Sequence, residues 1–179
     1  EATVVSAGLN NTIYVGTKSG KLFSVFKGKT ELILPGKFAI NTSISGICCG
    51  SDSTIWVATL GDGIYGFGNK GWEHFSIKNG LGDDYIYTIL CDSIGRVWAG
   101  SDGGLSYSSI KNSVLEFTNL DASAGLPDNI ILKLARGPGN SIGIGMQEKG
   151  FCFYLPDDKS FLYPDAFQNW EHGAVTSLI

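Results

Sequence analysis

Few side chains in this sequence could carry out acid–base chemistry or ligate a metal. The two histidines, His74 and His172, have no second ligand at a metal-binding spacing, and no segment has the Asp-x-Asp-x-Asp-Gly pattern of a calcium loop. No Ser or Cys lies in a Gly-x-Ser-x-Gly nucleophile turn. The sequence therefore predicts no catalytic residue, no metal site and no cofactor, and it predicts that this chain is not itself an enzyme.

Carboxylates in turns are better candidates for ligand binding than for catalysis. Asp62 and Asp102 lie in Gly-rich turns, where a carboxylate is exposed to solvent and can accept hydrogen bonds from a ligand. Asp52 and Asp92 lie in a different set of turns, and we expect their side chains to bond nearby backbone N–H groups. The same turn-making role remains an alternative for the first pair.

Repeated segments show which elements carry these side chains. The segment 12–17 (TIYVGT) returns in similar form at 54–59 (TIWVAT), 96–101 (RVWAGS) and 141–146 (SIGIGM). The second residues of these segments are 42, 42 and 45 positions apart. Each unit holds four short runs with the pattern of β-strands and none with a helical period. Four strands in 40–45 residues are typical of one propeller blade.

The sequence accordingly predicts an all-β fold, a β-propeller with four four-stranded antiparallel blades. The predicted blades are about 1–43, 44–85, 86–130 and 131–174. Residues 175–179 resemble the first strand of blade three and predict the first strand of a fifth blade, so we interpret the chain as part of a larger propeller. Trp56 and Trp98 recur at one repeat position and are expected to be buried between blades.

Composition excludes several classes of function. The chain has 179 residues, a formal net charge of −4 and no cluster of Lys and Arg, which argues against nucleic acid as a partner. No apolar run is long enough to cross a membrane. Its 25 glycines fit short strands joined by tight turns. The four cysteines lack zinc-site spacing, and we interpret them as small buried residues.

Blade three resembles the two-component regulator propeller repeat. The resemblance rests on residues 80–101 (GLGDDYIYTILCDSIGRVWAGS) and on the Gly-Gly-Leu that follows at 103–105. Blade two matches the repeat in 55–59 and blade four in 125–129, whereas blade one retains only Tyr14 and Gly16-Thr17. The resemblance implies the extracytoplasmic part of a histidine-kinase or hybrid two-component sensor, with the kinase elsewhere in a longer chain. The repeat motifs themselves are structural and transfer no ligand-binding residue.

One face of the predicted propeller gathers the candidate ligand-binding residues. Hairpins between the second and third strands of a blade share a face with the connections between blades, and there we expect Asp62, Asp102, Tyr85, Asp128, Asn129 and Trp170. Carboxylates and amides bind hydroxyl groups, and an aromatic ring stacks on the apolar side of a sugar. This composition suits a neutral oligosaccharide and suits a polyanion poorly. A merely solvated acidic rim remains the alternative, and the ring of Trp170 could instead cap the core.

Two functions from different classes follow from these observations. The first is an extracytoplasmic, periplasmic or extracellular, ligand-sensing module of a two-component sensor, with oligosaccharide as its possible ligand. The second is a structural or protein-interaction propeller without a small-molecule ligand, and a glycan-active enzyme ranks behind both. Expected partners are further blades or domains of a longer chain, or a second copy bound through bare blade faces. Contact of this segment with nucleic acid or with a membrane is not expected.

Overall fold

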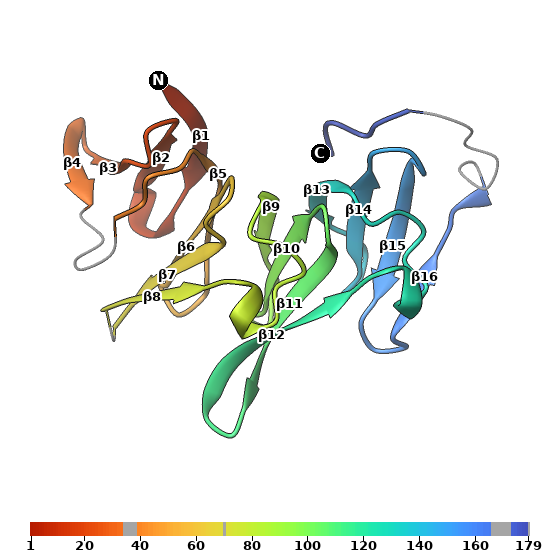
Figure 1. Cartoon of the computed structure of the whole chain (residues 1–179). Helices are drawn as coiled ribbons and strands as arrows, with labels where there is room; N and C mark the ends of the chain where they lie inside the picture. Colours follow the sequence, from red (N-terminus) through yellow and green to blue (C-terminus); the bar gives the residue numbers. More distant parts are fainter. Residues whose placement is uncertain (34–38, 70, 166–172, 179) are drawn as a thin grey trace.

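The computed structural model describes residues 1–33, 39–69, 71–165 and 173–178. Sixteen strands in this part of the chain form four sheets of four strands, each antiparallel (Figure 1). Blades one and two contain β1 Ala2–Ala7, β2 Ile13–Thr17, β3 Leu22–Phe26, β4 Lys29–Ile33, β5 Ile44–Cys49, β6 Ile55–Thr59, β7 Ile64–Gly68 and β8 Gly71–Phe75. Blades three and four contain β9 Ile86–Cys91, β10 Val97–Ser101, β11 Gly104–Lys111, β12 Val114–Leu120, β13 Ile131–Arg136, β14 Ile142–Met146, β15 Phe151–Leu155 and β16 Ser160–Leu162.

The predicted all-β propeller fold is confirmed. Helical structure among the described elements is confined to three 3-10 turns of three residues each, η1 Leu9–Asn11, η2 Ile77–Asn79 and η3 Ala122–Ala124. The first strands of successive blades contact one another in chain order, β1 with β5, β5 with β9 and β9 with β13. The blades therefore follow one another around an arc, as the change of colour from red to blue shows in Figure 1.

The second strands of blades two and three are buried on both faces because each of these blades is packed between two neighbours. All five residues of β6 and of β10 are buried, with Trp56 at 7% and Trp98 at 0% exposure, as the repeat position predicts. Small residues bring the blades together. A Cβ atom added to Gly100 would lie only 2.5 Å from Cγ2 of Ile131 in the next blade, so a larger residue at this position would push the two blades apart.

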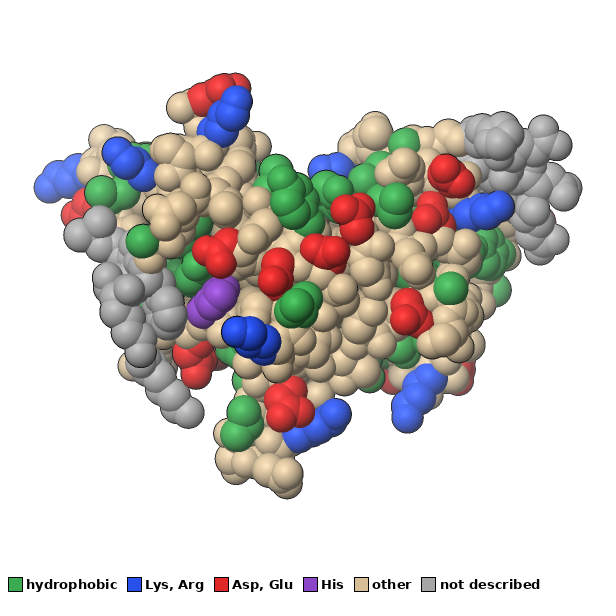
Figure 2. All heavy atoms as spheres, viewed as in Figure 1, with side chains coloured by type: hydrophobic (Ala, Val, Ile, Leu, Met, Phe, Trp, Pro, Cys, Tyr) green, Lys and Arg blue, Asp and Glu red, His purple; other side chains and the backbone are tan. Residues whose placement is uncertain are grey.

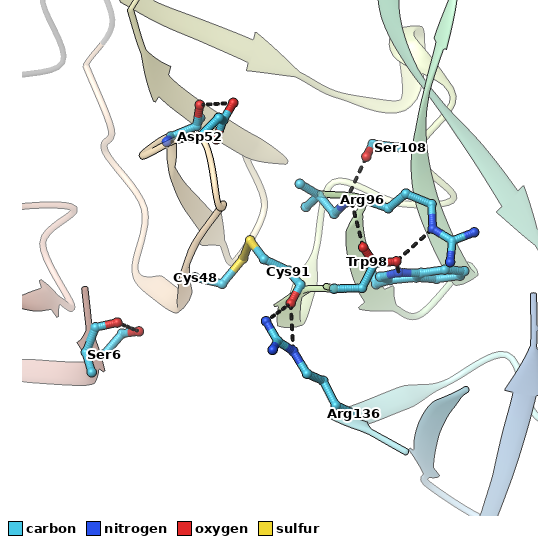
Figure 3. The surroundings of a disulfide bond; sticks show 12 residues. Ser6, Cys48, Asp52, Cys91, Arg96, Trp98, Ser108 and Arg136 are labelled. Carbon is cyan, nitrogen blue, oxygen red and sulfur yellow. Dashed lines mark hydrogen bonds and ion pairs between the residues drawn. A yellow bond between two sulfur atoms is a disulfide. The ribbon is translucent and has the colours of Figure 1, made fainter. Parts of the chain in front are cut away.

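A disulfide joins Cys48 of β5 to Cys91 of β9, with 5.8 Å between the two Cα atoms (Figure 3). The interpretation of all four cysteines as small buried residues is therefore wrong for this pair, while Cys49 and Cys152 are free thiols. The carbonyl oxygen of Cys91 also accepts hydrogen bonds from Nε and Nη2 of Arg136, at 3.1 and 2.6 Å. These bonds connect the inner strands of blades two, three and four.

Residues 173–178, within the segment for which the sequence predicts a first strand of a fifth blade, carry no strand assignment in the structure. Val175 nevertheless packs on blade four as first strands pack on the other blades. Its N–H donates to the carbonyl of Met146 at 3.0 Å, and its side chain lies against Gly145 as Ile131 lies against Gly100. The segment thus makes the expected contact without the expected strand.

The outward face of blade one is largely apolar. One cross-strand row in blade two, Ile47, Val57 and Tyr65, packs in the core between blades one and two. The corresponding row of blade one is Val5, Val15, Phe23 and Leu32. No preceding blade covers this row in the described chain, and Val5 is 65% and Leu32 45% exposed.

Candidate functional site

Loops at one end of the strands bring the predicted site residues together. The β6–β7 hairpin touches the connection between blades two and three, because the N–H groups of Gly61 and Gly63 donate to the carbonyl of Asp84 at 3.1 and 2.9 Å. The β14–β15 hairpin likewise touches the connection between blades three and four, where the N–H of Gln147 donates to the carbonyl of Ile130 at 3.0 Å. Hairpins and connections therefore form one continuous face.

Two connections in this face have the same internal hydrogen bond. Oδ1 of Asp84 accepts from the N–H of Ile77, at the start of η2, at 2.9 Å. Oδ1 of Asn129 accepts from the N–H of Ala122, at the start of η3, at 3.0 Å. Both side chains close a loop of eight residues, so Asn129 has a structural role that is repeated from blade to blade.

The residues just before them are also repeated. Oδ1 of Asp83 accepts from the N–H of Tyr85 at 2.7 Å, and Oδ1 of Asp128 accepts from the N–H of Ile130 at 3.0 Å. Oδ2 of Asp128 accepts a further bond, from the N–H of Glu148 at 2.7 Å. Asp128 thus uses both carboxylate oxygens to hold the connection and the next hairpin, which gives it a structural role.

A second group of side chains has more free surface. The ring of Tyr85 is 47% exposed and lies over Gly61, and its centroid is 6.3 Å from the ring centroid of Tyr87. The hydroxyl of Tyr87 donates to Oδ2 of Asp102 at 3.1 Å. Asp62 adjoins Gly61 in the same hairpin. We call Asp62, Tyr85, Tyr87 and Asp102 the tyrosine–aspartate patch; it connects the β6–β7 hairpin to the β10–β11 hairpin.

The carboxylates of this patch are held by tyrosine hydroxyl groups. The hydroxyl of Tyr65 donates to Oδ2 of Asp62 at 2.5 Å, and Nε2 of His74 lies 2.9 Å from the carbonyl oxygen of Asp62. The pKa of Tyr65 is raised well above its usual range, mainly by burial of the side chain and to a lesser extent by the hydrogen bond to Asp62. Burial, followed by the bond to Asp102, raises the pKa of Tyr87. Both phenols therefore remain protonated at neutral pH and act as hydrogen-bond donors rather than as bases.

The structure places the six predicted residues in different settings. Asp62, Tyr85 and Asp102 belong to one patch, whereas Asp128 and Asn129 build the next connection along the chain. Trp170 lies outside the described residues. Sequence reasoning missed Tyr87, which lies on the first strand of blade three and bonds to Asp102. Tyr87 is two residues after Tyr85, which precedes β9 and forms an isolated bridge with Leu60, and in extended chain this spacing places two side chains on the same side. This spacing was the available signal.

Acidic side chains extend across the face seen in Figure 2, above the centre of the molecule. Within the ranges that the structure describes, no three His, Cys, Asp or Glu side chains are placed to hold a metal ion. The described helices include none that is long and apolar enough to cross a membrane. The arrangement offers carboxylate acceptors, phenol donors and one exposed ring, which are groups that bind a polar neutral molecule.

Comparison with known proteins agrees with the fold. The chain has a TM-score of 0.77 and 19% identity to the extracellular domain of a protein from B. thetaiotaomicron described as a hybrid two component system, covering 97% of this chain and 24% of that one. A second extracellular domain from the same organism, described as a one component system, has a TM-score of 0.72 and 24% sequence identity. The match covers 100% of this chain and 24% of that one. Virginiamycin B lyase from Staphylococcus aureus has a TM-score of 0.69 and 16% sequence identity, and the match covers 91% of this chain and 55% of the lyase.

The chain spans about a quarter of the length of the first two structures. No curated protein matches it. One family model matches, the two component regulator propeller, at residues 80–103. That match runs from the end of η2 through β9 and β10 into the next hairpin, the segment on which the resemblance was based. The resemblance is thereby confirmed: residues 80–103 are a two component regulator propeller repeat within a β-propeller fold.

Proposed function

We propose that this chain is part of the ligand-sensing propeller of an extracytoplasmic two-component sensor and that the tyrosine–aspartate patch binds a neutral oligosaccharide. The observation that carries the sensor role is the match of the two component regulator propeller model to residues 80–103. The ligand-binding role of the patch is proposed from its own geometry, the exposed Tyr85 beside Tyr87 and Asp102. The two extracellular domains from B. thetaiotaomicron with the same fold support a sensory role.

The chemistry of the patch favours a sugar over a charged ligand. The exposed ring of Tyr85 offers an apolar surface for the C–H face of a pyranose, and Asp62 and Asp102 accept hydrogen bonds from hydroxyl groups. The carboxylates of Asp62 and Asp102 would repel a polyanion. The patch itself contains no Lys or Arg, and the basic side chain beside it is His74, whose Nε2 lies 3.5 Å from Oδ1 of Asp62.

An oxidising location is supported by the disulfide between Cys48 and Cys91, since such bonds persist outside the cytoplasm. We place the propeller in the periplasm or at the cell surface, with a histidine kinase elsewhere in a longer chain. The coding sequence that follows residue 179 tests this placement. A membrane span and a kinase domain there would agree with the proposal, and a cytoplasmic enzyme domain fused directly to the propeller would contradict it.

Titration calorimetry of the chain against a panel of neutral oligosaccharides tests the ligand. We expect Tyr85→Ala to weaken binding about tenfold, because it removes the stacking surface, and Asp102→Ala to weaken it by a similar factor. Glu31→Ala, an exposed carboxylate on β4 of blade one, is the matched control and should leave the affinity unchanged. If all three variants bind the glycan with the affinity of the wild type, the glycan site does not lie at the patch.

A protein-interaction propeller is the second candidate function. It is favoured by one observation: the acids and amide of the connections, among them Asp84, Asp128 and Asn129, already accept backbone hydrogen bonds. A face built in this way can be a rigid loop surface for another domain rather than a sugar site. This candidate predicts that no glycan of the panel binds. We propose no catalytic activity for the chain, although virginiamycin B lyase has the same fold.

We also propose that further blades, or a second copy, cover the bare face of blade one. The cross-strand row Val5, Val15, Phe23 and Leu32 matches a row that is buried in blade two, and exposed apolar area of this kind drives association. Sedimentation of the isolated chain should show concentration-dependent association. Replacement of Val5 by Asp should shift the equilibrium towards monomer; a monomer at all concentrations would contradict the proposal.

A further inference from the structure

A groove of about 700 Å³ lies between blades two and three, with most of its described lining at the opposite end of the strands from the tyrosine–aspartate patch. Its walls come from the turns and hairpins of that end: Asp52 after β5, Gly68 and Gly71 in the β7–β8 hairpin, and Gly95 before β10. The β11–β12 hairpin forms the remaining wall and projects well beyond its neighbours (Figure 1). The volume falls within the usual range of ligand sites.

The β11–β12 hairpin presents aliphatic side chains at this groove. Ile110 and Val114 both line it, and they are 76% and 56% exposed. Ile94, next to the lining residue Gly95, is 65% exposed. Ile110 pairs with Leu115 across the hairpin, so these two side chains share one face, and both line the groove. An aliphatic surface that is exposed on this scale is suited to contact with another molecule.

The titratable side chains of the described lining are two acids and His74, whose Nε2 lies 3.5 Å from Oδ1 of Asp62. Asp52 and Glu73 contribute carboxylates, and none of the described lining residues is Lys or Arg. Asp52 bonds to the N–H and hydroxyl of Thr54, at 3.0 and 2.8 Å. Glu73 is exposed, and its carboxylate makes no hydrogen bond or ion pair with the described residues. The groove therefore favours a positively charged group beside aliphatic ones.

A sugar does not fit this lining well. The aromatic rings at the groove, Trp56 and Phe75, are only 7% and 5% exposed, so neither offers a face on which a pyranose could stack. Nucleotides and other anions would meet the carboxylates of Asp52 and Glu73. Aliphatic walls with carboxylates are instead what a polypeptide segment with mixed aliphatic and basic side chains requires.

We propose that this groove binds an extended segment of another polypeptide, in which Lys or Arg adjoins Val, Ile or Leu. The aliphatic side chain packs on Ile110, which shares its face of the hairpin with Leu115, and the basic group pairs with Glu73. The groove adjoins the patch at His74, which lines the groove and lies 2.9 Å from the carbonyl oxygen of Asp62, but the two sites differ in chemistry. A sensor with both sites could bind its ligand at one end of the blades and another protein at the other end.

A library of random heptapeptides displayed on phage, panned on the intact chain, tests the proposal. We expect the enriched peptides to carry Lys or Arg next to an aliphatic residue. Synthesised with a fluorophore, they should lose about tenfold in affinity with Ile110→Ser and with Glu73→Lys. Both positions are exposed, so the variants should fold; circular dichroism checks this. Glu31→Lys is the control for the change of charge and should bind as the wild type does.

Three results would overturn the proposal: no enrichment, enriched peptides without basic residues, or binding that Ile110→Ser and Glu73→Lys leave unchanged. The patch variant Tyr85→Ala separates this proposal from the sensor function. It should reduce glycan binding and leave peptide binding intact, and Glu73→Lys should do the reverse. A result in which no glycan binds would therefore not contradict the peptide site, and a result in which no peptide binds would not contradict the glycan site.

Discussion

Loss of the disulfide between Cys48 and Cys91 should lower the free energy of unfolding by roughly 2–4 kcal/mol. The bond closes a loop with a sequence separation of 43, and its removal gives the unfolded chain more conformations. Since small proteins are stable by only about 5–15 kcal/mol, this loss is a large fraction of the total. Urea unfolding of Cys48→Ser and of Cys91→Ser, followed by tryptophan fluorescence, measures it.

Cys49→Ser is the matched control, because Cys49 is the adjacent residue and a free thiol. We expect its unfolding midpoint to stay close to that of the wild type. A reducing agent should lower the wild-type midpoint and leave the midpoint of the Cys48→Ser/Cys91→Ser double variant where it was. Thiol titration of the denatured, unreduced wild type gives an independent check. Four reactive thiols instead of two would show that the bond does not form.

The repeats made the fold predictable. The second strands of blades two, three and four are fully buried, and the matching strand of blade one has the same apolar pattern, so the spacing of Ile13, Ile55, Val97 and Ile142 marks successive blades directly. The end of the chain was less predictable. Val175 packs on Gly145 as a first strand does, but strand pairing depends on a second strand beside it, and 173–178 have none in the described chain. The apolar pattern predicted a strand here, and the structure shows the packing of Val175 on blade four without a strand.

The candidate site was predictable only in part, and the reason lies in the repeats. Asp128 and Asn129 occur at the same repeat positions as Asp83 and Asp84, and residues that recur in this way build the loop itself. Tyr85 and Asp102 are better candidates because the exposed ring and the free carboxylate surface are not used in closing a loop. Comparison of repeat positions therefore separates loop-building residues from candidates for binding.

The disulfide could have been recognised from the same comparison. Cys48 and Cys91 are 43 residues apart, close to one repeat of 42, so both lie on the first strand of their blade. First strands of adjacent blades pack side by side, which brings the two side chains within bonding distance. Burial statistics for single cysteines contain no information on this pairing, and the interpretation based on them failed.

Asp92 should contribute more to stability than any other carboxylate in a turn of this chain. Oδ1 accepts from the N–H groups of Ile94 and Arg96, at 3.0 and 2.8 Å, and Oδ2 accepts from Nε of Arg96 and from the indole N–H of Trp98, at 2.7 and 2.9 Å. Figure 3 shows the indole and the guanidinium side by side at this point. Asp92 is 8% and Trp98 0% exposed, so no solvent replaces a lost partner.

The expected effect of Asp92→Asn is a loss of roughly 3 kcal/mol in the free energy of unfolding at neutral pH. The amide oxygen can keep the two backbone bonds, but the amide nitrogen then faces two donors, the guanidinium of Arg96 and the indole of Trp98. Urea unfolding measures the loss. Asp52→Asn is the matched control: Asp52 occupies the equivalent turn of blade two, is exposed, and bonds only to Thr54, so we expect a change within about 0.5 kcal/mol.

The same interaction should make stability depend on pH. Burial by itself would raise the pKa of Asp92, but the hydrogen bonds from Trp98 and Arg96 outweigh it and hold the pKa below its ordinary value. A carboxylate with a lowered pKa contributes its full stability above the pKa of the unfolded chain, about 4, and loses that contribution as the pH falls through the lower folded value. The difference between the wild type and Asp92→Asn should therefore be constant from neutral pH down to about pH 5 and should shrink below pH 4. A difference that stays the same down to about pH 2 would show that the charge on Asp92 is not what holds Arg96 and Trp98 in place.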